Sequence, residues 1–357
     1  MGHKALVITG QTPSRAAPLI NLLKKVNMDF VCFSTHPEPS VDIIRQGTQY
    51  AREKHCDLII GYGGGSAVDT AKAIAAIMSN GGDPLDYLEV IGKGLPLLKP
   101  SIPWIAIPTT AGSGAEVTNN AVLASPEHHV KVSLRNPMMI APLVIVDPEL
   151  TYSMPSSVTA STGLDALTQL IEPYVSIKAN PLTDSLCREG IRRVARSLLR
   201  VYENGNDQKA REDMSLAALF GGLALSNAKL GAAHGIAGPM GGMIKAPHGG
   251  ICAGLLSHVM EANIKALQER LPDSEALERY DEIAKWLTGD MEAGAQNGVE
   301  WIRDLCRSLK IPPLSKYGLQ KSDFPILVEK AQRASSMKGN PINLTSAEIN
   351  AILSHVI

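Results

Sequence analysis

The chain has 357 residues, of which 45% are hydrophobic and 19% charged, and its formal net charge is −1. This balance offers no basic surface for nucleic acid or an anionic membrane, and an aromatic content of 4% leaves few rings for stacking on bases. The length exceeds one ordinary hydrophobic core, so we expect two domains.

The cysteines and the N-terminus indicate a cytoplasmic protein. The five cysteines are scattered, form no Cys-x-x-Cys pair and have apolar neighbours, which is typical of reduced thiols. The first residues, MGHKALVITG, contain no long apolar run before a cleavage site, and no stretch reaches the apolar length of a membrane helix. We therefore expect a soluble protein of the cytoplasm.

The first part of the chain alternates short apolar runs with amphipathic segments. The apolar runs predict strands at 30–33 and 57–61 and buried strands at 5–8, 104–107 and 144–146. Helical spacing of apolar residues predicts helices at 15–26, 41–54 and 66–78. Strands and helices in this order predict a parallel sheet with crossover helices, and 117–134 is expected to form a hairpin over that sheet. We assign these elements to an α/β domain of residues 1–154.

The character of the sequence changes near residue 155. β-Branched runs give way to alanine- and leucine-rich helical spacing, which predicts helices at 182–202, 210–227, 258–269, 275–287 and 298–309. We therefore predict a second, all-helical domain of residues 155–357, so that the fold class is α/β followed by all-α.

Two turns rich in small residues follow predicted strands. The run GYGGGS at 61–66 opens a helix, and such a turn can bind phosphate through free backbone N–H groups. Ser66 replaces the last glycine of the strict GxGxxG pattern, so a plain tight turn is an equally good interpretation; Ser66 and Asp69 also fit a capping box. The run TTAGSG at 109–114 follows another strand. Because parallel strands end at one edge of a sheet, the two turns together favour a nucleotide.

The helical part contains four candidate metal ligands. His234 and His248 lie in an apolar, glycine-rich stretch, and alone they are more typical of core or loop histidines with satisfied hydrogen bonds. Upstream, Asp165 and Gln169 are four residues apart and share one face of a helix. Imidazole is the commonest ligand of transition metals, so the four residues together predict a metal site.

These motifs, in this order and at this spacing, resemble the iron-containing (group III) alcohol dehydrogenases. The resemblance runs from about Lys4 to the C-terminus and rests on GGGSxxDxxK at 63–72, PTTAGS at 108–113, GLDALT at 163–168 and PHG at 247–249. It implies a dehydroquinate synthase-like fold with a dinucleotide-binding domain and a helical domain. It also implies hydride transfer between NAD or NADP and an alcohol or carbonyl carbon, usually with a divalent metal such as iron or zinc. We further expect a homodimer.

The resemblance implies a cofactor role for one group of residues. Gly63, Gly64, Gly65 and Ser66 would hold the pyrophosphate, with Asp69 supporting the turn. The residues implied to line the rest of the cofactor are Thr109, Thr110, Ser113, Thr118, Lys131 and Leu150. The competing interpretations are a helix cap for Asp69, strand-end turn residues for the threonines and a solvated side chain for Lys131.

The implied metal ligands, which are also the implied catalytic residues, are Asp165, His234 and His248. Gln169 stands where most members have a histidine as the fourth ligand, and its neutral oxygen is a weaker donor for iron or zinc. Gly238 stands where many members have a histidine that relays protons near the substrate. The chain also begins at what corresponds to the second strand of the family.

The choice of cofactor and the function stay open at this point. Ser34 and Thr35 lie near the expected ribose site and do not repel a 2′-phosphate, so NAD and NADP both fit. The alternatives to a metal-assisted alcohol dehydrogenase are a metal-independent reductase of the maleylacetate reductase type and a nucleotide-binding relative without catalysis. A lyase of the dehydroquinate synthase type would need more basic residues than Lys131, Arg135 and Lys245.

Overall fold

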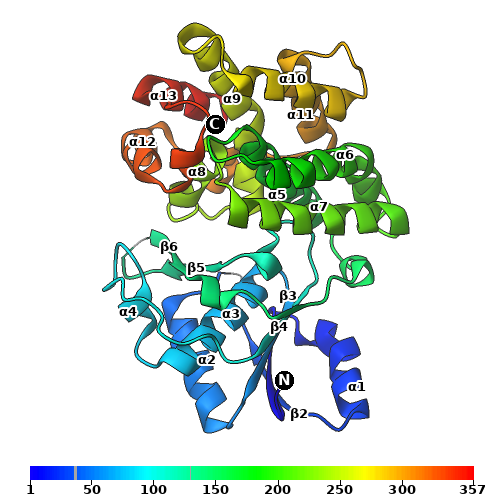
Figure 1. Cartoon of the computed structure of the whole chain (residues 1–357), viewed down its shortest axis with the longest axis vertical. Helices are drawn as coiled ribbons and strands as arrows, with labels where there is room; N and C mark the ends of the chain where they lie inside the picture. The colour runs from blue at the N-terminus through cyan, green and yellow to red at the C-terminus, as the bar shows by residue number, and fades with distance from the viewer. Residues whose placement is uncertain (36–37, 129) are drawn as a thin grey trace. The chain divides into compact units, whose positions relative to one another are not determined.

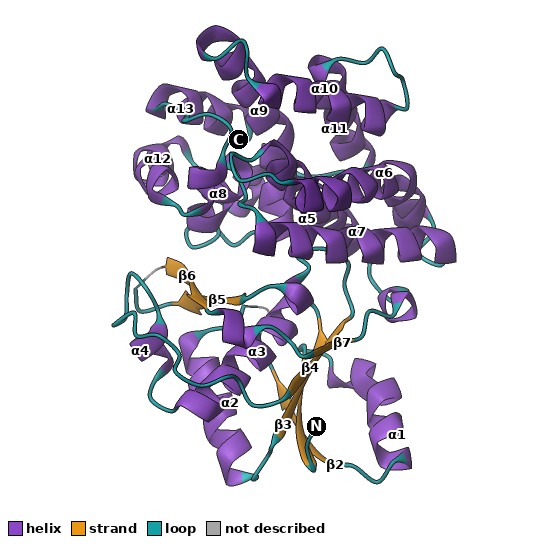
Figure 2. Cartoon of the chain, in the orientation of Figure 1, coloured by secondary structure: helices purple, strands orange, loops and turns teal. Residues whose placement is uncertain are grey.

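The computed structural model describes residues 1–35, 38–128 and 130–357. The chain divides into two compact units (Figure 1). The first comprises Met1–Thr110 and Ala115–Leu150, and the second comprises Ala111–Gly114 and Thr151–Ile357. All strands of the described residues belong to the first unit, and the second consists of helices and loops (Figure 2). The predicted fold class is confirmed.

A five-stranded parallel sheet lies at the centre of the first unit. In spatial order its strands are β2 (Asp29–Ser34), β1 (Lys4–Thr9), β3 (Leu58–Gly63), β4 (Trp104–Pro108) and β7 (Leu143–Val144). Leu6 and Ile8 of β1 belong to one apolar core, and Ala5 and Val7 belong to another. Burial on both faces explains why the central strands are continuous apolar runs in the sequence.

Helices cover both faces of this sheet (Figure 1). α1 (Ala17–Lys25) contributes Leu23 to the core that contains Ala5 and Val7. α2 (Val41–Glu53) and α3 (Gly65–Asn80) pack against each other and supply the core on the opposite face. The short α4 (Pro84–Tyr87) follows α3 in the chain. This arrangement places the beginning of α3 directly after the end of β3.

The last strand is shorter and more exposed than predicted. β7 has two residues, pairs with Ile105 and Ala106 of β4, and forms the edge of the sheet. The side chains of Leu143 and Ile145 are 40% and 44% exposed. The prediction of a buried strand at 144–146 was therefore wrong, because an edge strand has a neighbour on one side only.

The hairpin predicted within 117–134 is present, and a buried lysine holds it to α3. The hairpin consists of β5 (Asn120–Ser125) and β6 (Val130–Arg135). Nζ of Lys72 donates to the carbonyl oxygens of Ala115 and Asn120, both at 2.7 Å, and to Oγ1 of Thr118 at 2.8 Å. Lys72 is fully buried, so these three acceptors take the place of water around its charge.

Asp69 does not cap α3. The N-cap is Gly64, which makes no side-chain cap hydrogen bond. Because the helix begins at Gly65, Asp69 lies in the second turn, beyond the N3 position that a capping box requires. Its Oδ2 instead accepts a hydrogen bond from the backbone N of Val122 at 3.0 Å, and its Oδ1 lies 3.5 Å from Nζ of Lys72. The predicted capping box was wrong, and Asp69 joins Lys72 in holding the hairpin.

The second unit is built around α5 (Ser156–Val175), which is buried at every residue from Gly163 onward. It packs against α6, α7 and α9. The other helices of this unit are α6 (Pro181–Glu203), α7 (Gln208–Asn227), α8 (Ala232–Met240), α9 (His248–Arg270), α10 (Glu275–Thr288), α11 (Ala295–Ser308), α12 (Phe324–Arg333) and α13 (Ser346–His355). The helix predicted at 258–269 begins ten residues earlier, directly after Pro247, so that His248 is its first residue.

No single helix of the described residues is long and apolar enough to cross a membrane. α7 and α8 reach that length and composition only as a pair, and the pair is bent by 95° at the break between them.

The contacts of Lys72 give a first prediction. Replacing Lys72 by Met leaves the carboxylate of Asp69 buried without its cation and leaves three acceptors without a donor. We expect Lys72→Met to lower the free energy of unfolding of the first unit by about 3–5 kcal/mol. Urea unfolding, followed through Trp104 in a Trp286→Phe/Trp301→Phe background, measures this loss. Lys25→Met, at an exposed lysine, is the matched control, and equal losses in the two variants would refute the role of Lys72.

Glu116 gives a second prediction, which concerns pH. This carboxyl is buried in the segment next to Lys72, and burial raises its pKa to about 7. Because this pKa is higher in the folded protein than in the unfolded chain, the folded protein holds the proton more tightly. The free energy of unfolding therefore falls as the pH rises from about 4.5 through 7 and the carboxyl ionises. Glu116→Gln removes this loss, which is about 3 kcal/mol. We expect the variant to gain stability over wild type near pH 8 and little near pH 5; an equal gain at both pH values would contradict the prediction.

Candidate functional site

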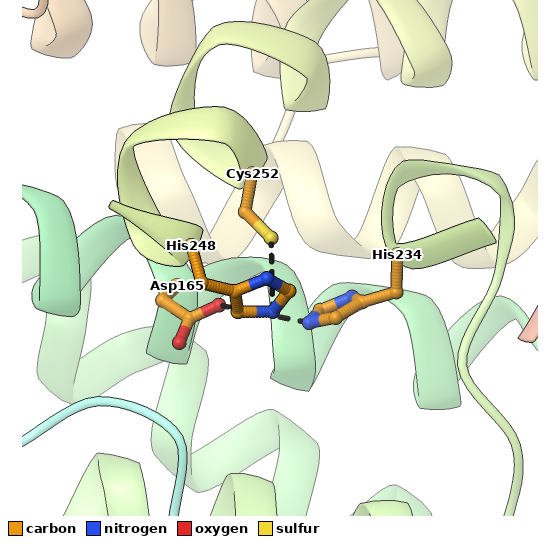
Figure 3. A group of neighbouring side chains, drawn as sticks. All are labelled: Asp165, His234, His248 and Cys252. Atoms are coloured by element: carbon orange, nitrogen blue, oxygen red, sulfur yellow. Dashed lines mark hydrogen bonds and ion pairs between the residues drawn. The ribbon is translucent and has the colours of Figure 1, made fainter. Parts of the chain in front are cut away.

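Three residues predicted as metal ligands meet in the second unit, and a cysteine joins them (Figure 3). Asp165 comes from α5, His234 from α8, and His248 and Cys252 from the first turns of α9. Oδ1 of Asp165 lies 3.6 Å from Nε2 of His234 and 3.9 Å from Nε2 of His248. Sγ of Cys252 lies 3.7 Å from Nε2 of His248, and all four ligand atoms lie within 4.8 Å of one another.

The spacing and the chemistry of this cluster fit one metal ion. Ligand atoms about 2.0–2.3 Å from a tetrahedral ion lie about 3.3–3.8 Å from each other. Oδ1 of Asp165 and Nε2 of His234 are both buried, and neither has a hydrogen-bond partner among the described residues. Two buried polar atoms that face each other without a bond are costly, and a cation between them removes that cost.

Glu172 positions His234. The carboxylate is buried, its Oε2 accepts a hydrogen bond from Nδ1 of His234 at 2.6 Å, and its Oε1 accepts one from the backbone N of Ala233 at 2.6 Å. An ionised carboxylate only accepts, so Nδ1 carries the proton and Nε2 keeps a lone pair directed at the cluster. A Cβ at Gly231 would lie 3.0 Å from Oε1 of Glu172, so glycine there allows the carboxylate to approach the start of α8.

Close packing between α9 and α5 positions His248. A Cβ at Gly249 would lie only 2.4 Å from the carbonyl oxygen of Ser161 and 3.2 Å from Cβ of Asp165. Any larger residue at position 249 would force the two helices apart. The glycine that follows His248 in the sequence therefore allows this histidine to reach the carboxylate of Asp165.

Burial and charge act in opposite directions on this cluster. Cys252 raises the pKa of His248, whose side chain is 45% exposed, above its usual range. Burial lowers the pKa of His234, but Cys252, Glu172 and Asp165 together outweigh burial and hold this pKa well above its usual value. Burial raises the pKa of Asp165, and the two imidazoles lower it further than burial raises it. The cluster therefore favours positive charge at its centre, which protons or a metal cation can supply.

The structure directs Gln169 toward a backbone carbonyl. Its Nε2 donates to the carbonyl oxygen of Ser113 at 2.6 Å, and Ser113 belongs to the short segment that packs with the helical unit. Gly238, at the position of the family's relay histidine, lies in α8. Apart from the chain neighbours and backbone of its own helix, no atom of the described residues lies within 4 Å of the place where its Cβ would be.

The two turns predicted to bind a nucleotide lie side by side at one edge of the sheet. Gly63 ends β3, and its carbonyl oxygen accepts a hydrogen bond from the backbone N of Thr109 at 2.9 Å. A Cβ at Gly64 would lie 3.3 Å from Cγ2 of Thr110. Gly65 and Ser66 begin α3, so the positive end of its dipole faces this edge. The arrangement suits a phosphate group.

The other predicted cofactor residues make contacts of their own. Oγ1 of Thr118 accepts from Lys72 beneath the hairpin, and Nζ of Lys131 on β6 forms an ion pair with Glu38 at 2.7 Å. Lys131 is thus not a freely solvated lysine. Leu150 packs against the apolar core on the α1 face of the sheet.

The interpretation of the sequence missed Glu172 and Cys252. The spacing held signals for both. Cys252 follows His248 by four residues, which on a helix places both side chains on one face. Glu172 lies seven residues after Asp165, two turns along the same face of α5, and carboxylates at that spacing flank a common site.

Comparisons with known proteins identify the family. Residues 1–148 match the family described as iron-containing alcohol dehydrogenase, and residues 159–357 match the family described as Fe-containing alcohol dehydrogenase, C-terminal. The chain is 38% identical to alcohol dehydrogenase 4 of Schizosaccharomyces pombe over 317 residues, which cover 88% of this chain and 72% of that protein.

Solved structures agree as well. A crystal structure of 1,3-propanediol oxidoreductase is similar with a TM-score of 0.91 and 32% identity, covering 100% of this chain and 92% of that one. The sulfoacetaldehyde reductase of Bifidobacterium kashiwanohense, solved in complex with NAD+, has a TM-score of 0.87 and 27% identity, covering 99% and 91%. The resemblance seen in the motifs is confirmed: the chain belongs to the iron-containing alcohol dehydrogenase family and is an alcohol dehydrogenase-like oxidoreductase.

Proposed function

We propose that the chain transfers a hydride between a nicotinamide cofactor, NAD or NADP, and the carbonyl or hydroxyl carbon of a small alcohol, aldehyde or ketone. A divalent metal held by Asp165, His234 and His248 assists the transfer. The observation that carries the proposal is the pair of buried atoms without partners, Oδ1 of Asp165 and Nε2 of His234, which face each other 3.6 Å apart.

The cofactor half of the proposal rests on the turn at 63–66. The beginning of a 16-residue helix without a side-chain cap offers backbone N–H groups and a positive dipole end to a pyrophosphate. The threonine turn at 109–110 lies against it and would offer hydroxyl groups to the phosphates. A related reductase is solved with NAD+, and neither Ser34 nor Thr35 carries a charge that would repel NADP.

The metal half of the proposal assigns each side chain a role. Asp165 supplies an anionic oxygen, and His234 and His248 supply neutral nitrogens. Glu172 holds the proton of His234 at Nδ1 and so keeps Nε2 available as a ligand. The chemistry that a divalent ion held there would supply is polarisation of the substrate's carbonyl oxygen and stabilisation of negative charge on that oxygen. Gly238 has no side chain to move a proton, so the proton transfer would have to use water or the cofactor ribose.

His248→Ala tests this function. We expect at least about a 100-fold loss of aldehyde reduction, because loss of a ligand costs more than the 10–100-fold typical of outer-sphere partners. The Kd for NADH or NADPH should stay unchanged, because the glycine turn lies in the other unit. Steady-state kinetics on an aldehyde and ketone panel and titration of cofactor fluorescence measure the two quantities.

His3→Ala is the control for this experiment, because His3 is exposed and pairs with Asp57 at the surface. Full turnover of wild type in chelator, with His248→Ala also active, would favour a metal-independent reductase. Cofactor binding without turnover on any carbonyl compound would favour a nucleotide-binding relative.

Glu172→Gln tests the positioning of His234. In one orientation, the new amide would direct its N–H at Nδ1 of His234; in the other, it would leave the backbone N–H groups of α8 without an acceptor. Either orientation changes the position or protonation of Nε2 of His234, the predicted ligand atom. We expect metal affinity to fall by about 10–100-fold while the helical content is retained. Competition with a chromophoric chelator and far-UV circular dichroism report these properties. Glu282 lies on α10, and its carboxylate accepts a hydrogen bond from the hydroxyl of Tyr174. Glu282→Gln should leave metal affinity at the wild-type value.

A further inference from the structure

Cys252 belongs to the core of the second unit and also lies beside the predicted metal ligands. Its side chain is fully buried, and it lies one turn after His248 on α9. Its Sγ is 3.7 Å from Nε2 of His248 and within 4.8 Å of the ligand atoms of Asp165 and His234 (Figure 3). A buried thiol that serves packing alone needs no such neighbours.

Gln169, predicted as the fourth ligand, is held by a contact outside the cluster. The amide nitrogen of Gln169 donates to the carbonyl oxygen of Ser113 at 2.6 Å, a contact that fixes the side chain against the 111–114 segment. In the described residues, the group of His, Cys, Asp and Glu side chains that could hold a metal contains Cys252 as its fourth member. The chain thus offers a sulfur where the predicted donor was a neutral amide oxygen.

We propose that Cys252 is the fourth protein ligand of the metal and that its sulfur makes the site selective for zinc. This inference rests on the proposed metal site. Cysteine binds metal as the thiolate, so binding forms a metal–sulfur bond and releases the thiol proton to solvent. Thiolate is a soft donor that favours zinc, whereas carboxylate, carbonyl and water suit magnesium and manganese. One sulfur, two imidazoles and one carboxylate form a donor set typical of zinc.

Cobalt substitution tests the ligand directly. The full-length protein is freed of metal with a chelator and titrated with Co²⁺ alone, because a sulfur–cobalt bond gives a charge-transfer absorption in the near ultraviolet that N and O ligands do not give. We expect this band at one equivalent in wild type and in Cys187→Ala, which removes another fully buried thiol. We expect no such band in Cys252→Ser or Cys252→Ala. A band that persists in Cys252→Ser would overturn the proposal.

Zinc affinity tests the selectivity. Cys252→Ser should weaken Zn²⁺ binding by more than about 100-fold and Mn²⁺ binding by much less, since the hydroxyl is a hard donor. Equal weakening of both metals would overturn the zinc selectivity. X-ray absorption of the Zn²⁺-loaded wild type needs no variant: one sulfur at about 2.3 Å supports the assignment, and a shell of N and O alone overturns it.

The outcomes separate this inference from the proposed function. If wild type binds one Co²⁺ or Zn²⁺ without a sulfur signature, the metal site stands and the role of Cys252 is wrong. If wild type binds neither metal, the metal half of the proposed function falls together with the inference, while cofactor binding is tested independently by NADH titration.

Discussion

One buried carboxylate, that of Glu172, sets both the start of α8 and the direction of His234. Its oxygens accept hydrogen bonds from the backbone N of Ala233 and from Nδ1 of His234, each at 2.6 Å. The first turn of a helix presents unpaired N–H groups and the positive end of the dipole, which stabilise a carboxylate without a counter-cation. The same carboxylate keeps the proton on Nδ1 of His234. The start of α8 and the orientation of the His234 imidazole are therefore fixed by one group.

The rest of the cluster depends on where two other helices meet. His248 and Cys252 share one face of α9, and Asp165 lies on α5, more than eighty positions away in the sequence. Gly249 permits the contact between the two helices, because even a Cβ there would meet the backbone of Ser161 at 2.4 Å. A displacement of α9 would move the histidine and the cysteine together. The metal site is therefore a property of helix packing rather than of any loop.

The sequence allowed the fold class and three members of the cluster to be predicted, for physical reasons. Buried parallel strands are continuous apolar runs, and the motifs around Asp165, His234 and His248 keep their order and spacing. Cys252 was not predicted because a cysteine between apolar neighbours is typical of a core residue. Only the start of α9 at His248 places Cys252 on the same helical face as that histidine. The capping box at Asp69 was wrong because its carboxylate contacts Val122, 53 residues away, which the local pattern does not reveal.

The charge of the cluster bears on how strongly a metal there could act. With Asp165 as the one anionic ligand, a divalent ion keeps a net charge of about +1, whereas a second anion at Cys252 brings the centre to about zero. A neutral centre is less costly to bury, so the ion is held more firmly. The same neutralisation weakens the pull on a carbonyl oxygen, which makes the fixed dipoles around the substrate more important for the rate. A thiolate in this site would therefore increase retention of the metal and reduce its strength as an electrophile.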